Sequence, residues 1–522
     1  MLRYELNILP VNLTFLLQIQ GKMLYAVVIS LLAGPLLYLL YLAYESMTRP
    51  RRFPPGPMGL PFVGSLHLRG EFPEKNCIEL AKKYGNTFSL KFLRSNFVCL
   101  VGTEANREVL CHKYIADRTP TNIFTMVKGK NAPGIVHSRF NEQLRVNRTF
   151  LHTMITDANA VPGNNLEQIT QRETARLIEE LENLFKNGEP GYVRKSVRIG
   201  FFTVLISMIF GTKENRSEKW LKKLEKVMED IIALEDYFMD KKLIMSELLT
   251  GLDKIWLPEA GKQFIAACDR IFAFIQEGID IHKRTFKSLT EPRSLIDCYL
   301  KRRRNAGHGK DSLYSDYNLK ILIFDIFIGA LKNVSTGMEF STLYLAAHPE
   351  IQKKLHDEVF EVLGKDGEVK YNDILRMPYT KATLYELLRF GNMLANGVPR
   401  VAMEDVSISG YSIPKGTIFL MNPYSSNKQE GKWKYPESFN PENFLDEEGK
   451  FQNNAAFQVF GAGARKCPGP RAAKQQLFMF LVTIMQNFTI KPETDETEID
   501  YDGLPGLIRM PRKQKIRLLP RD

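Results

Sequence analysis

The sequence has few cysteines and no sign of a disulfide framework. Six cysteines in 522 residues are scattered along the chain without paired spacing, and this pattern fits a reducing compartment better than an oxidising one. No period of a few tens of residues recurs, which excludes a repeat protein. There is no zinc finger, RNA-binding sheet motif or concentrated basic helix, so nucleic acid is not expected as a partner.

The composition is that of an ordinary globular protein with an excess of basic charge. Hydrophobic residues make up 44% of the chain and charged residues 25%, which allows a substantial core. The net charge is +12 at pH 7. Charge spread over a solvated surface is the commonest explanation. Attraction to an anionic membrane surface or to an acidic protein partner is the alternative.

One long run near the N-terminus lacks charge altogether. Residues 23–44 form an uncharged stretch of 22 residues, which as a helix would cover roughly 33 Å and cross a bilayer. Arg49, Arg51 and Arg52 follow it, and basic residues prefer the cytoplasmic side. We therefore predict a lumenal segment over residues 1–22 and a transmembrane anchor over residues 23–44, with a buried core helix as the alternative.

The rest of the chain is expected to form one cytosolic domain over residues 58–522, behind a basic and proline-rich hinge over residues 45–57. Residues 86–101 and 406–420 alternate in character and contain turn residues, which predicts small β structures. The periodicity from about residue 165 to 347 is mostly helical. The sequence therefore predicts a fold that is mainly α with small β-sheets.

A glycine-rich loop over residues 460–469 carries the most informative cysteine. Cys467 stands just before an apolar helical pattern, so the positive end of a helix dipole favours its thiolate form. Pro468 and Pro470 have no N–H, which leaves the amide of Gly469 as the main nearby donor to the sulfur. A thiolate on a rigid loop is the axial ligand that an iron porphyrin needs.

The order Phe-x-x-Gly-x-Arg-x-Cys-x-Gly in this loop resembles the haem-ligand signature of the cytochrome P450 family, and the likeness runs from about Pro54 to the C-terminus. The resemblance implies the cytochrome P450 fold, in its microsomal, membrane-anchored type, with residues 58–522 as the haem-thiolate catalytic domain. It implies haem b as the cofactor, with the iron ligated by Cys467. It also places Phe460 and Gly461 against that cofactor.

The resemblance further predicts cationic partners for the haem propionates. Arg465 matches the arginine of the cysteine loop, and Arg400 matches a basic position after a helix with a Glu-x-x-Arg motif. The family also uses a Trp-x-x-x-Arg pair on an early helix. Here Phe140 holds the tryptophan place and Leu144 the arginine place. Arg145 follows one residue later and is the candidate on that helix.

The Glu-x-x-Arg motif is matched by Glu386 and Arg389, which share one helix face and can pair. In the family, an arginine of a Pro-Glu-Arg-Phe stretch locks this pair, but Asn443 stands at that place here. An amide can form a hydrogen bond but brings no charge, so we expect a weaker or differently closed lock. We interpret the group as structural support for the cysteine loop.

The apolar run over residues 319–345 resembles the helix that crosses the distal face of the haem. The family pattern there is small-Gly-x-acid-Thr, and this chain has Lys332 at the place of the acid and Asn333 at the place of the alcohol. Family members use the acid and the alcohol to position water and deliver protons. Asn333 and Lys332 are therefore the first catalytic candidates, and Thr336 is a third if the helix locally unwinds.

The resemblance leaves three functions open. The first is a haem-thiolate monooxygenase of the endoplasmic reticulum membrane, working as a monomeric catalytic unit on a lipophilic substrate. Its electron donor would be NADPH-cytochrome P450 reductase, with cytochrome b5 as a second candidate partner. The second is an O₂-independent hydroperoxide or epoxide isomerase or dehydratase, since family branches with this chemistry also lack the acid–alcohol pair. The third is a non-catalytic haem- or sterol-binding protein.

Two short runs favour one substrate class. Residues 377–380 and 408–411 look similar to the ecdysteroid-pathway branch of arthropods, and this likeness favours a sterol or steroid. The loop over residues 117–134, which is expected to shape the substrate pocket, carries no readable code for a substrate.

Overall fold

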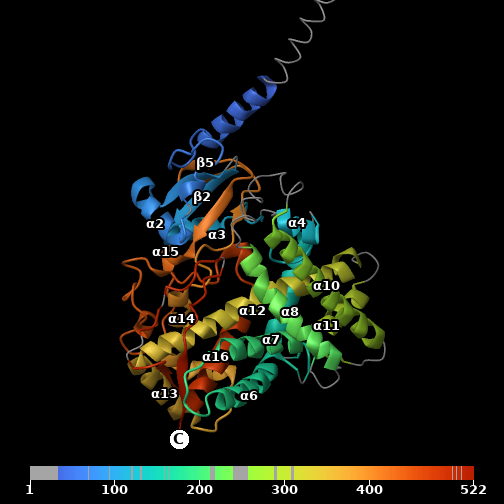
Figure 1. Cartoon of the computed structure of the whole chain (residues 1–522), viewed down its shortest axis with the longest axis vertical. Helices are drawn as coiled ribbons and strands as arrows, with labels where there is room; N and C mark the ends of the chain where they lie inside the picture. Colours follow the sequence, from blue (N-terminus) through green and yellow to red (C-terminus); the bar gives the residue numbers. More distant parts are fainter. Residues whose placement is uncertain are drawn as a thin grey trace, which may run out of the picture.

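The computed structural model is mainly helical with small separate sheets (Figure 1). The strands β1 to β6 gather with α2 (Pro73–Tyr84), α3 (Thr103–Cys111) and α15 (Pro423–Asn427) in one part, and the long helices fill the other part, together with β7 and β8. The predicted fold class is confirmed. The structure describes residues 33–521 except 69, 93–94, 119–121, 130–131, 158, 163, 212–217, 239–256, 287–290, 307–310, 496–497, 501 and 507.

Both predicted β regions form sheet structure. Residues 86–101 contain the hairpin of β1 (Thr87–Phe92) and β2 (Ser95–Val101), which pair antiparallel. From the second region, β6 (Ile418–Asn422) adds parallel to β2, and β3 (Arg400–Val401) pairs antiparallel with β6. The sheet order is therefore β1-β2-β6-β3. Separate hairpins join β4 (Val406–Ile408) to β5 (Tyr411–Ile413) and β7 (Phe488–Pro492) to β8 (Ile516–Pro520).

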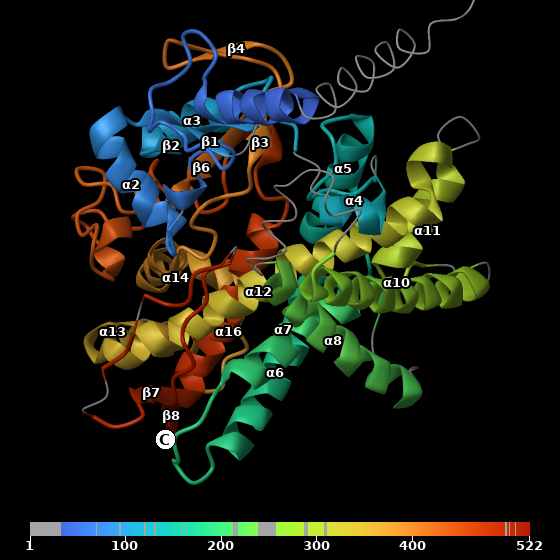
Figure 2. The ribbon, with the colours of Figure 1, turned by 45° about the horizontal axis from the view of Figure 1, so that its top comes forward.

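Helix α12 (Asp316–Ala347) runs through the middle of the helical part (Figure 2). It is helical over its whole length, so the local unwinding considered for Thr336 is not present. Among the described residues, α12 is the helix that is long and apolar enough to cross a membrane, but most of it is buried inside the protein. A helix that is apolar all round and buried belongs to a core. The helices around it are α4 (Asn122–Lys128), α5 (Glu142–Thr156), α6 (Leu166–Leu184), α7 (Arg194–Phe210), α8 (Glu218–Phe238), α10 (Glu259–Phe286), α11 (Leu295–Asn305), α13 (Pro349–Leu363), α14 (Pro378–Gly391) and α16 (Pro470–Asn487).

The N-terminal segment leaves the body as a helix over residues 33–47 (Figure 1). Its large apolar side chains are exposed, among them Leu36, Leu37 and Tyr44. An exposed apolar helix is what an anchor over residues 23–44 would require. Residues 1–32, which include the predicted lumenal segment and the start of that anchor, lie outside the described part of the chain, so the anchor stays a prediction.

The predicted hinge is fastened to the sheet where its prolines lie. Ser89 of β1 donates from its Oγ to the carbonyl oxygen of Pro54 at 2.7 Å and from its N–H to that of Pro55 at 2.7 Å. A Cβ on Gly56 would lie 2.0 Å from the carbonyl oxygen of Ser89. Only a glycine therefore lets the proline-rich segment lie this close to β1.

The pair of Glu386 and Arg389 is fully buried on α14. Its guanidinium and carboxylate form two hydrogen bonds, each of 2.7 Å, and both side chains are 0% exposed. Asn443 donates from its Nδ2 to the Glu386 carboxylate at 3.1 Å, and the N–H of Asn440 donates to the same oxygen at 2.8 Å. The lock is therefore closed by an amide and a backbone N–H. Arg389 also donates to the carbonyl oxygens of Asn427, Tyr435, Pro436 and Ser438.

Replacing Glu386 with Gln should lower the free energy of unfolding by about 3–5 kcal/mol, because the substitution leaves the Arg389 charge buried without its counter-charge. The measurement is the shift of the thermal unfolding midpoint of the full-length protein. Glu79→Gln is the matched control, since Glu79 forms an exposed i,i+3 pair with Lys82 and exposed pairs contribute little. Equal shifts for the two variants would contradict the structural role of the buried pair.

Candidate active site

The loop before α16 holds Cys467 through its backbone. The Cys467 N–H donates to the carbonyl oxygen of Phe460 at 2.8 Å, and this bond closes the loop. Gly463 has φ +67°, and a Cβ there would lie 2.1 Å from the carbonyl oxygen of Leu110 on α3. Only glycine permits this approach. The loop sequence therefore positions the cysteine between α3 and the N-terminal end of α16.

The surroundings of the Cys467 sulfur agree with the expectation from its flanking prolines. The N–H of Gly469 donates to Sγ at 3.4 Å. Burial raises the pKa of the Cys467 thiol, while the Gly469 N–H and the charge of Arg148 act in the opposite direction. A metal ion bound to such a thiol removes its proton outright. The sulfur is thus held ready as a metal ligand at a fixed place.

Four arginines surround the cysteine loop, and their partners are main-chain carbonyl oxygens. Each of Arg118, Arg148, Arg400 and Arg465 donates to at least one carbonyl oxygen at a distance between 2.5 and 2.7 Å. In the described part of the chain, none of the four forms an ion pair with a carboxylate within 4.0 Å. The region therefore collects positive charge, and the nearby Asp117 carboxylate, which favours the charged forms of Arg118 and Arg465, offsets it only in part.

Burial and mutual repulsion both weaken the charged forms of these groups. Burial is the main cause that lowers the pKa of Arg400 and of Arg465 to about 10. Burial also lowers the pKa of Arg118, with contributions from the charges of Arg465, Arg400 and Arg148. Nε of Arg118 and Nε of Arg400 are buried and have no hydrogen-bond partner among the described residues. Buried donors without partners are costly, so the two carboxylates of a haem fit this place.

The residues predicted to hold the haem differ in their position and burial. Arg465 and Arg400 are 6% and 2% exposed and are two of the four arginines around the cysteine loop, here called the ring of arginines. Phe460 and Gly461 lie on the cysteine loop, where Gly461 has φ +65°. Arg145 is exposed and lies over the ring of Phe140, with 5.2 Å between the guanidinium carbon and the ring centre.

Two arginines of the ring were missed by the sequence reasoning. Arg148 lies one turn after Arg145 on α5 and is half-buried near Cys467. Its signal was the spacing from Leu144, because Leu144 and Arg148 stand four residues apart like the tryptophan and arginine of the family pair. Arg118 lies in the loop before α4 and had no comparable signal. Its place became visible only from its contacts.

The three catalytic candidates lie close together on α12, where Lys332 and Asn333 are neighbours and Thr336 follows one turn later. Lys332 and Thr336 are buried, at 5% and 0% exposed, and Oγ1 of Thr336 has no hydrogen-bond partner in the described structure. Asn333 is half-buried and donates from Nδ2 to the carbonyl oxygen of Gly329 at 2.8 Å. One turn after Asn333, a Cβ on Gly337 would lie 3.5 Å from Leu477 of α16. This close approach joins α12 to the helix that begins directly after the cysteine loop.

A cysteine held by its loop at the start of a helix, ringed by arginines that lack carboxylate partners, defines a haem-thiolate protein. The chain matches the family model described as cytochrome P450 over residues 54–518. It is 30% identical over 496 residues to cytochrome P450 2J1 of Oryctolagus cuniculus, an alignment that covers 94% of this chain and 96% of that protein. It is also 30% identical over 474 residues to cytochrome P450 2J2 of Homo sapiens, covering 90% and 91%. The chain belongs to the cytochrome P450 family.

Membership confirms several expectations. The protein is an oxidoreductase of the monooxygenase class, its cofactor is haem, and the haem iron is ligated by Cys467. An enzyme of this class needs a redox partner that donates electrons, and its substrate is lipophilic. The contributions of the other predicted site residues remain predictions.

Replacing Arg148 with Gln should weaken haem retention, whereas Arg145→Gln should leave it unchanged. Arg148 lies beside the cysteine loop and Arg145 is exposed. We expect haem to leave the Arg148 variant about tenfold faster, the size of one lost charge-assisted hydrogen bond. The measurement is the rate of haem transfer to an excess of apomyoglobin. A faster loss from the Arg145 variant alone would restore Arg145 as the propionate partner.

Proposed function

We propose that this protein is a monooxygenase anchored in the endoplasmic reticulum membrane by residues 23–44, with its catalytic domain over residues 58–522 in the cytosol. It inserts one oxygen atom from O₂ into a sterol or steroid. The observation that carries the proposal is the combination of Cys467 on its fixed loop with four arginines around it that form no carboxylate ion pair among the described residues. The likeness of residues 377–380 and 408–411 to the ecdysteroid-pathway branch supports the substrate class.

In this proposal the chain holds and orients the cofactor. Arg465, Arg400 and Arg148 bind the propionates. These carboxylates provide a negative charge, which the carbonyl oxygens that now accept from the three arginines lack. When bound, the haem supplies the activation of oxygen. The apolar side chains of α12 exclude bulk water from the distal side.

Asn333 and Lys332 take the place of the usual acid and alcohol. One N–H of Asn333 is used by the carbonyl oxygen of Gly329, and its Oδ1 and second N–H remain to hold a water molecule. An amide orients such a group without transferring a proton itself. Lys332 adds a buried positive side chain one residue away, and Thr336 adds a hydroxyl on the next turn.

A second candidate function is isomerisation or dehydration of a lipid hydroperoxide or epoxide without external O₂. The replacement of the acid and alcohol by Lys332 and Asn333 favours it, because such a reaction needs no delivered protons for splitting O₂. A non-catalytic haem- or sterol-binding role is the further alternative. It requires that Cys467→Ala keep the cellular activity of the protein.

The proposed redox partner is NADPH-cytochrome P450 reductase, with cytochrome b5 as a second candidate. Lys466 and Arg471 are exposed on either side of Cys467, and Lys474 is half-exposed on the first turns of α16. These side chains offer a basic face to an acidic flavoprotein. The catalytic unit is proposed to be a monomer.

Purified protein with reductase and a panel of sterols and other lipids tests the proposal directly. We expect a product that contains one added oxygen atom and that forms only with NADPH, reductase and O₂, and we expect Cys467→Ala to abolish it. Turnover of a lipid hydroperoxide without reductase and without O₂ would instead establish the second candidate. Oxygenation of fatty acids but of no sterol would overturn the proposed substrate class.

Replacing Asn333 with Ala should lower product formation per NADPH consumed by about tenfold, the size of one lost hydrogen bond. Ser341→Ala is the matched control, because Ser341 also donates to a carbonyl oxygen four residues earlier on α12, that of Gly337 at 2.7 Å. The measurement compares the product formed with the NADPH oxidised. If both variants keep the parent ratio, Asn333 has no part in the reaction.

A further inference from the structure

One carboxylate of α12 binds two other segments of the chain. The side chain of Asp325 is 1% exposed and accepts a hydrogen bond and an ion pair from Lys128. It also accepts from the N–H groups of Ile135 at 2.7 Å and Val136 at 3.0 Å. A buried carboxylate with one cation and two backbone donors is fully satisfied. None of the predicted roles on α12 uses this residue.

The first of these segments is α4, which ends at Lys128. The Lys128 side chain is 3% exposed, and its ammonium lies 4.6 Å from the ring centre of Phe324 and 5.2 Å from that of Phe124. The hydroxyl of Tyr317 donates to the Lys128 carbonyl oxygen. Helix α4 is therefore fixed to α12 through both the side chain and the main chain of one lysine.

The second segment is residues 134–138, which lies against α12 as closely as the backbone permits. Gly134 has φ +117°, and a Cβ there would lie 2.4 Å from Oδ2 of Asp325 and 2.8 Å from Cγ2 of Ile321. The Gly134 carbonyl oxygen accepts from Nδ2 of Asn147 on α5 at 3.1 Å. The absence of a side chain at Gly134 is thus a condition for the bonds that Asp325 makes.

The same segment is bonded to the cysteine loop through its carbonyl oxygens. Arg465 donates to the carbonyl oxygen of Ile135 at 3.2 Å and to that of Ser138 at 2.5 Å. Arg465 stands two residues before Cys467. Residues 134–138 therefore bond to Asp325 of α12 through their N–H groups and to Arg465 of the cysteine loop through their carbonyl oxygens.

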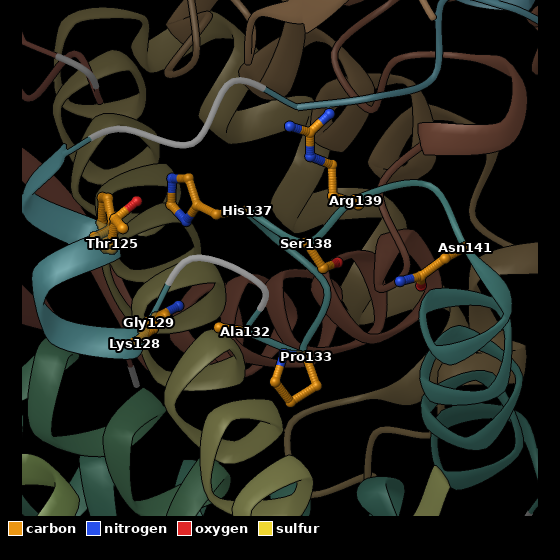
Figure 3. A pocket seen from close by; sticks show the side chains of 10 residues that line it. Thr125, Lys128, Gly129, Ala132, Pro133, His137, Ser138, Arg139 and Asn141 are labelled. Carbon is orange, nitrogen blue, oxygen red and sulfur yellow. The ribbon is translucent and has the colours of Figure 1, made fainter. Parts of the chain in front are cut away.

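A cavity of about 130 Å³ lies between α4 and this segment (Figure 3). Figure 3 shows Thr125 and Lys128 on the α4 side, and His137 and Ser138 on the other. Both walls are bonded to Asp325 through Lys128, Ile135 and Val136. The carboxylate therefore sets the separation of the walls.

We propose that Asp325 is a positioning residue for the haem site. It holds residues 134–138 where their carbonyl oxygens can accept hydrogen bonds from Arg465. It also joins α4, on the substrate side, to the cysteine loop. Loss of its charge frees the segment, so that Arg465 loses two of its carbonyl partners and the haem is held less firmly. The inference concerns the seating of the cofactor and holds for the monooxygenase and the isomerase alike.

The test is the rate of haem loss from the haem-loaded Asp325→Asn variant to excess apomyoglobin. Glu339→Gln is the matched control, because Glu339 is another buried acid of α12. It pairs with Arg194 at 2.6 Å and Arg198 at 3.0 Å. Within the described residues, Glu339 forms no hydrogen bond or ion pair with residues 134–138. We expect the Asp325 variant to lose haem at least tenfold faster than the Glu339 variant. Equal rates would overturn the proposal.

Two further variants keep the test decisive if Asp325→Asn does not fold. Gly134→Ala leaves every charge in place but pushes residues 134–138 away from Asp325, so it should also speed haem loss. Lys128→Met removes the link to α4 and retains the two N–H bonds, so we expect a smaller effect on haem loss. Amide hydrogen exchange at Ile135 and Val136 gives a second readout. Unchanged exchange and unchanged haem loss in Gly134→Ala would overturn the proposal.

Discussion

The charge around the cysteine loop is the constraint on which the rest of the site depends. Four arginines converge there, and within the described chain their partners are carbonyl oxygens. Carbonyl dipoles stabilise a buried guanidinium less than a carboxylate does. The site therefore favours an anion, and we propose that the carboxylates of haem take this place. The loop geometry that fixes Cys467 places the metal ligand next to that anion.

The parts that hold this loop come from distant places in the chain. Glu386 and Arg389 on α14 fasten the segment from Asn427 to Asn443. Asp325 on α12 fastens residues 134–138. Each uses a buried carboxylate with a cation and backbone donors. Such a group is costly to bury unless every partner is in place, so it specifies one arrangement of its segments.

How much of this could be predicted varied with the kind of signal. Cys467 and its Gly469 donor could be found because the loop motif and the two prolines are local. The sheet regions and α12 could be found from residue alternation and apolar length. The lock on Glu386 was expected to be weaker or differently closed, and Asn443 and a backbone N–H close it. The sequence favours Arg145 over Arg148 when the Trp-x-x-x-Arg pair is placed on Phe140 and Leu144, one turn before Leu144 and Arg148. The sequence does not show which of the two arginines points inward.

The sequence by itself determined the family, the metal ligand and the unusual pair of Lys332 and Asn333, because each is carried by residue identity at short spacing. Only the tertiary structure decided that Arg148 and Arg118 join Arg400 and Arg465 around the cysteine loop, and that Asp325 joins α4, residues 134–138 and α12. The physical reason is that a buried charge is stabilised by whatever surrounds it in space. A partner of Asp325 lies 197 residues away along the chain and a partner of Arg465 lies 349 residues away, and no local pattern records them.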